Sequence, residues 1–74
     1  MGKPADRTRQ LKKRMEIAKD TIYQLRLLEQ ELENDSQAEE EAGTVNMALV
    51  NVQGMLKKWD RELDRLDRLA DLVG

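Results

Sequence analysis

The sequence predicts an all-α fold: an antiparallel two-helix hairpin of the coiled-coil type, completed by oligomerisation into a four-helix bundle or by a partner helix. Three observations predict it. Charged residues make up 38% of the 74-residue chain, and it contains only four glycines and one proline, a composition typical of long helices. Apolar residues recur at steps of three and four in two long segments. A short polar stretch between these segments would allow the chain to reverse.

The first element is expected to be a helix over about residues 6–33. Residues 1–5 are expected to be disordered, and Asp6 is a suitable capping residue for a helix that starts just after Pro4. Seven apolar residues at helical spacing would form one stripe along the helix: Leu11, Met15, Ala18, Ile22, Leu25, Leu28 and Leu32.

The chain is expected to turn at about residues 34–36. Asn34 is predicted to close the first helix in the left-handed conformation. Ser36 and Glu39 have the spacing of a capping box, in which a serine hydroxyl and a glutamate carboxylate satisfy N–H groups at a helix start. A second helix is therefore expected over about residues 37–73.

The second helix carries the longest periodic pattern in the chain. Its apolar residues alternate steps of four and three over five heptads: Ala38, Ala42, Val45, Leu49, Val52, Leu56, Trp59, Leu63, Leu66, Ala70 and Val73. Folding the chain about residue 35 brings Leu25 near Val45 and Leu11 near Trp59, so the two apolar stripes coincide.

The leucines beyond Trp59 face only the polar start of the first helix and are expected to lack cover within the chain. Exposed apolar residues at the end of a heptad pattern, with a tryptophan beside them, favour binding to another helix. The candidate partner-binding residues are Leu56, Trp59, Leu63, Leu66, Leu69 and Val73.

Charge is segregated along the predicted hairpin. The segment from Glu29 to Glu41 has seven carboxylates and no basic residue, whereas residues 1–20 have seven basic and three acidic residues. A rod with one acidic and one basic end favours head-to-tail pairing. The acidic segment lacks the glycine-containing loop of an EF-hand, so we interpret it as a solvated tip without a bound metal.

The basic run near the N-terminus suggests a possible nucleic-acid-binding site, because Lys and Arg make most contacts to phosphate. Its residues are Arg7, Arg9, Lys12, Lys13 and Arg14. The net charge of the whole chain is −2, and no stacking aromatic residue accompanies the run. These observations favour a solvated helix face over a nucleic-acid site.

The sequence offers no constellation for catalysis. It contains no His and no Cys, it has no Gly-rich phosphate loop, and Ser36 has no plausible base, so we predict no enzymatic activity and no cofactor. No apolar run approaches the roughly 20 residues that span a membrane. Because the absence of cysteine fits a reducing compartment, we expect a soluble, cytoplasmic protein without membrane contact.

The predicted function is that of a non-enzymatic module for protein–protein interaction or oligomerisation. Two alternatives stay open: a nucleic-acid-associated oligomerisation domain that uses the basic N-terminal helix, and a small helical co-chaperone or adaptor that folds on its partner. In outline the pattern resembles several helical hairpins, including the Asp-phosphatase hairpins of sporulating bacteria. Their motif requires Ser-Gln before Glu62-Leu63-Asp64, where this chain has Asp60-Arg61, so the sequence is assigned to no family.

Overall fold

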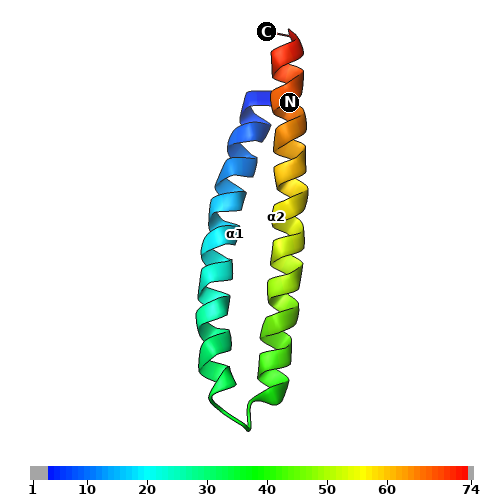
Figure 1. Cartoon of the computed structure of the whole chain (residues 1–74). Coiled ribbons are helices and arrows are strands. Elements are labelled where there is room, and N and C mark those ends of the chain that lie inside the picture. Colours follow the sequence, from blue (N-terminus) through cyan, green and yellow to red (C-terminus); the bar gives the residue numbers. More distant parts are fainter. Residues whose placement is uncertain (1–3, 74) are drawn as a thin grey trace.

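The chain forms two long helices joined by a short turn, as a computed structural model shows (Figure 1). The structure describes residues 4–73 and, within them, the side chains of residues 6–72. Helix α1 spans Pro4–Glu33 and helix α2 spans Glu39–Val73. They lie antiparallel, side by side, in a rod with extents of 56 × 19 × 14 Å. The predicted all-α hairpin is confirmed.

Helix α1 begins two residues earlier than the sequence suggested. Pro4 and Ala5, which we expected to be disordered, are its first residues, and residues 1–3 of the expected disordered segment lie outside the described residues. Proline suits a first helical turn because its fixed φ is already helical and its missing N–H would have no partner there.

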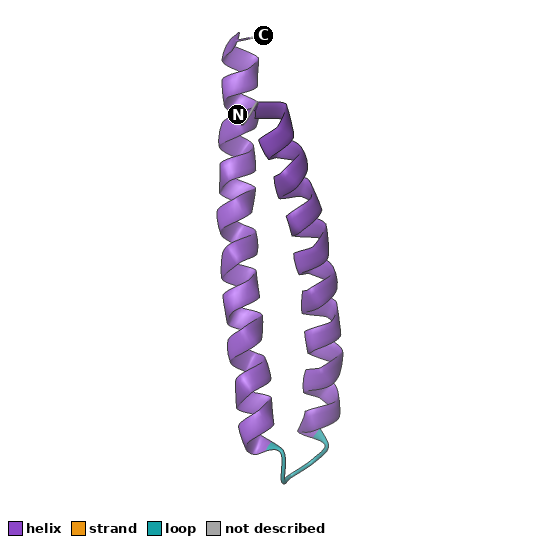
Figure 2. Cartoon of the chain, turned by 180° about the vertical axis from the view of Figure 1, so that it is seen from behind, coloured by secondary structure: helices purple, strands orange, loops and turns teal. Residues whose placement is uncertain are grey.

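Asp35 organises the turn, which covers residues 34–38 and is drawn in teal in Figure 2. Its carboxylate oxygen Oδ1 accepts a hydrogen bond from the backbone N–H of Gln37 at 3.0 Å. Its carbonyl oxygen accepts one from the N–H of Ala38 at 3.1 Å, and its own N–H donates to the carbonyl of Leu32 at 3.1 Å. Aspartate is favoured in turns for this reason: its side chain can satisfy a backbone N–H two residues on.

Asn34 ends α1 in a different way from the one we predicted. No residue in the described part of the chain has a positive φ, so Asn34 is not left-handed. Its side-chain amide donates instead to the carbonyl of Gln30 at 3.3 Å, which satisfies one of the carbonyl groups left without a partner at a helix C-terminus.

Helix α2 begins at Glu39, two residues later than expected. The carbonyl of Ala38 accepts the N–H of Ala42 at 2.9 Å, the first hydrogen bond of the helical pattern. The capping box expected of Ser36 is not among the hydrogen bonds of the described turn. Asp35 provides a side-chain acceptor within the turn instead, and residues 36–38 belong to the turn.

The two helices meet along a single line of apolar side chains, which we call the seam. Its most buried members are Leu11, Met15, Ala18, Ala38, Val45 and Leu49, all of which belong to the two predicted stripes. Leu28, which we predicted to lie in the stripe of the first helix, does not belong to the seam, because its side chain is 46% exposed whereas Glu29 is half-buried. The seam continues from Leu25 by a step of four to Glu29, which leaves Leu28 at the edge.

The end of α2 is only partly uncovered. Leu63 and Leu66 are half-buried within the single chain, so our expectation that they lack cover is wrong for these two residues. The reason is that α1 starts at Pro4 and extends along α2 to this level. Beyond that level α2 projects past the end of α1 (Figure 1), and there Leu69 and Leu72 are exposed.

Candidate functional site

The seam has two flanks, and a contact across the hairpin identifies which residues share one of them. One edge of α1 carries four residues at seven-residue spacing: Arg7, Arg14, Thr21 and Leu28. One edge of α2 carries five: Glu41, Ala48, Met55, Glu62 and Leu69. Residues seven apart lie on the same face of a helix. Because Arg7 contacts Glu62, the two rows lie on the same flank.

The contact between Arg7 and Glu62 is a bidentate ion pair at the open end of the hairpin. Arg7 Nε donates to Glu62 Oε2 at 2.6 Å, and Arg7 Nη2 donates to Glu62 Oε1 at 3.0 Å. The hydrogen bond from Arg7 lowers the pKa of Glu62, and the same bond raises the pKa of Arg7. Both groups are therefore charged at neutral pH, and the pair fixes α1 against α2 at this level.

The middle of this flank is an apolar groove between the helices, with a volume of about 260 Å³. It is lined by Arg14, Ile17, Ala18, Thr21, Val52, Met55 and Trp59, and we call this set the apolar flank. Ile17 is 57% exposed and Met55 is 45% exposed, while Trp59 is half-buried. Large apolar side chains thus lie open to solvent at the rim of a groove that another helix could fill.

The opposite flank has a different chemistry. Its groove, of about 400 Å³, is lined by Arg26, Glu29, Gln30, Glu33, Asn46, Leu49, Val50 and Gln53, and we call this set the polar flank. Six of the eight side chains carry charges or amides. A helix packed here would remove these groups from water, which costs free energy unless each of them gains a new partner.

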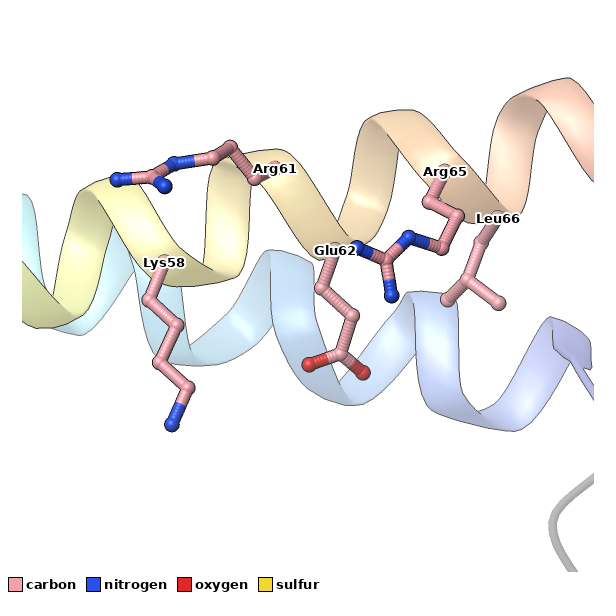
Figure 3. Close-up of a pocket in the computed structure, with 5 residues that line it drawn as sticks. All are labelled: Lys58, Arg61, Glu62, Arg65 and Leu66. Carbon is pink, nitrogen blue, oxygen red and sulfur yellow. The ribbon is translucent and has the colours of Figure 1, made fainter.

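A third groove, the basic groove, lies on α2 at the open end and has a volume of about 630 Å³ (Figure 3). It is lined by Lys58, Arg61, Glu62, Arg65 and Leu66. In Figure 3, Glu62 and Leu66 point toward α1 while Arg61 extends away from it. Because Arg7 pairs with Glu62, the three remaining charged groups of the groove are all positive.

The predicted partner-binding residues are distributed along α2. Leu56, Trp59, Leu63 and Leu66 are half-buried and Leu69 is exposed, whereas the side chain of Val73 lies outside the described side chains. Only Trp59 lines the apolar groove. Sequence reasoning missed Ile17, Thr21 and Met55 because it followed the centre of the seam, although the seven-residue rows beside the seam would have indicated Thr21 and Met55.

The five predicted nucleic-acid-binding residues do not form one cluster. Arg7 pairs with Glu62, and Arg14 lines the apolar groove. Arg9, Lys12 and Lys13 are exposed, and at roughly 100° of helical rotation per residue they share about a quarter of the α1 circumference. The structure thus gathers three of the five on one face.

Comparisons with known proteins do not add to this geometry. No model of a known family, no curated protein and no solved structure matches the chain significantly. Over the described residues, neither α1 nor α2 has a segment long and apolar enough to cross a membrane. The same residues contain no group of three or more side chains suited to hold a metal ion.

Proposed function

We propose that this chain is a non-enzymatic protein-interaction module that packs its apolar flank against another helical surface in coiled-coil fashion. The observation that carries the proposal is the exposure of Ile17 and Met55 beside a groove that reaches Trp59. A small chain without disulfides buries little of its apolar surface alone, and additional helices are a common remedy.

The energetics support this choice of flank. Complete burial of a fully exposed Ile or Met side chain contributes about 1.5–3 kcal/mol, and the half-exposed Ile17 and Met55 would each contribute roughly half of that in a complex. Trp is among the residues that contribute most at protein interfaces. Of the two apolar side chains that line the polar flank, Leu49 is already buried in the seam, and charged and amide groups surround Val50. An approaching helix therefore gains more free energy on the apolar flank.

Photo-cross-linking tests the proposal directly. A photoreactive phenylalanine analogue is placed at Met55 on the apolar flank and, as the matched control, at Val50, an exposed apolar residue on the polar flank. We expect covalent adducts from position 55 in purified protein or in extract, and few from position 50. Equal yields at the two positions, or none at either, would refute the proposed surface.

An adaptor that folds on a partner of another kind would use the same surface, and the mass of the adduct identifies such a partner. Nucleic-acid association is a second candidate, because Arg9, Lys12 and Lys13 share one exposed face of α1 toward the open end of the hairpin. Fluorescence anisotropy of a labelled oligonucleotide tests it. Binding through phosphates weakens steeply and linearly on a log–log plot against salt concentration, whereas a protein-only module shows no binding to titrate.

A further inference from the structure

Along the side of the hairpin that contains the apolar flank, the side chains change in character from the turn to the open end. The row on α2 begins with Glu41 near the turn, continues with Ala48 and Met55, and reaches Glu62 at the open end. On α1, Glu31 lies fourteen residues from Ile17, so it shares the face of Ile17 near the turn. The flank is therefore acidic near the turn and apolar in the middle, and it borders the basic groove at the open end.

Opposite charges lie at the two ends of the rod, at similar distances from its apolar middle. The turn end holds the seven carboxylates between Glu29 and Glu41 without a basic residue. At the open end, Lys58, Arg61 and Arg65 line the basic groove and form no salt bridge within the described residues. Thr21 and Val52, from the apolar groove, lie about halfway between these two ends along the rod.

We infer that the apolar flank binds a second copy of this chain in antiparallel orientation, so that the acidic turn end of each copy lies beside the basic groove of the other. This inference rests on the proposed function and specifies the partner. A two-fold axis at the level of Val52 overlaps the two apolar flanks and brings Glu41 of each copy to the level of the basic groove of the other, between Arg61 and Arg65. The result is a four-helix bundle with two identical charged contacts.

The charges decide between the possible orientations. A parallel pair would place the two acidic ends together, with their seven carboxylates each, and would leave both basic grooves unmatched. Like charges placed side by side disfavour an interface strongly, whereas complementary patches fix its register. The ends are far apart relative to the screening distance of about 10 Å at 0.1 M salt, so each contact acts separately. The antiparallel arrangement satisfies both ends at once.

Charge reversal tests this arrangement by sedimentation equilibrium at low salt. The turn variant is Glu31→Lys with Glu41→Lys, and the groove variant is Lys58→Glu with Arg65→Glu. Each variant alone should raise the dissociation constant of the dimer by roughly tenfold or more. An equimolar mixture of the two variants should restore tight dimers, because each contact in the mixed dimer again joins opposite charges.

The matched control is Glu33→Lys with Glu39→Lys, which makes the same change of charge at the same end of the rod but on the polar flank. Both residues are exposed; Glu33 lines the polar flank, and Glu39 lies seven residues before Asn46, which lines it too. It should dimerise nearly as the parent does. The inference is overturned if the mixture associates no more tightly than the separate variants, or if the control weakens the dimer as much as the turn variant. It is also overturned if the parent is a monomer at all concentrations. If that monomer binds heparin through the basic groove, the groove recognises a polyanion and not a second copy of the chain. Photo-adducts from position 55 to a different protein would then preserve the proposed function, and their absence would refute that as well.

Discussion

Leu11 and Leu72 are the two extremes of leucine burial among the described side chains, at 0% and 82% exposed. Leu11→Ala removes packed methyl groups from the seam and should lower the free energy of unfolding by about 2–5 kcal/mol. Leu72→Ala makes the same chemical change on the projecting end of α2 and should have little effect. Thermal melts followed by circular dichroism measure both, and equal losses would contradict the described seam.

The Arg7–Glu62 pair gives the hairpin a dependence on acidity. The pKa of Glu62 is lowered from its ordinary value of 4.5, first by the hydrogen bond from Arg7, so the folded state favours the ionised carboxylate. The stabilisation is therefore fully present above pH 4.5 and is lost as the pH falls through the lowered pKa. Glu62→Gln should melt slightly below the parent at pH 7, since partly exposed pairs stabilise little, and the difference should vanish in acid.

A second ion pair serves as the control for this prediction. Arg68 Nη2 lies 3.0 Å from Asp64 Oδ2 within one turn of α2, and both side chains are mostly exposed. Asp64→Asn should therefore leave the melting temperature nearly unchanged at every pH. A difference between Glu62→Gln and the parent that persists at pH 2 would show that shape, and not charge, accounts for the effect of residue 62.

The ion pair also shows how far residue-level prediction could reach. The seam predicted from spacing places Arg7 and Glu62 at the same level, but it does not say which edge of the seam each side chain occupies. Assigning each side chain to one edge of the seam requires the seven-residue rows on both helices to be considered together. The burial of Leu11 followed from spacing alone, because a residue at the centre of the seam is covered whichever way the edges turn.

At the scale of whole elements, Gly43 and Gly54 are weak points in α2. Both lie inside the helix without a positive φ, and a Cβ added at either position would meet no atom within 4 Å. Gly43→Ala and Gly54→Ala should each stabilise the protein by about 0.5–1 kcal/mol, because alanine loses less backbone freedom on folding. Chemical denaturation measures the gain, and Ala70→Gly, the reverse change at an exposed position of the same helix, should give a loss of similar size.

Both helices and the position of the turn could be predicted from periodicity, whereas the details of the turn could not. Asn34, Asp35 and Ser36 can all close or open a helix, and they are adjacent in the sequence. Two of them bond to the backbone in the structure: the Asn34 amide donates to the carbonyl of Gln30, and the Asp35 carboxylate accepts from the N–H of Gln37. Residue types and spacing alone do not distinguish these roles, and they do not predict that α2 begins only at Glu39.

For the whole molecule, the antiparallel dimer makes a prediction about shape. Two rods that pair side by side with opposite directions share their length, so the longest dimension should remain close to the 56 Å of one chain. Small-angle X-ray scattering of the dimer measures this dimension. A value about twice as long would show end-to-end association instead, in which the apolar flanks stay uncovered.

The position of the Arg7–Glu62 pair also determines how the hairpin responds to force. Arg7 and Glu62 join the helices near the start of α1, so tension that pulls α1 away from α2 at this level peels the helices apart instead of sliding one along the other. Peeling loads the ion pair first and then one layer of the seam at a time, down to the turn. Tension across the open end therefore separates the layers of the seam one after another and needs only a small force. Tension that slides one helix along the other would have to break all the layers of the seam together.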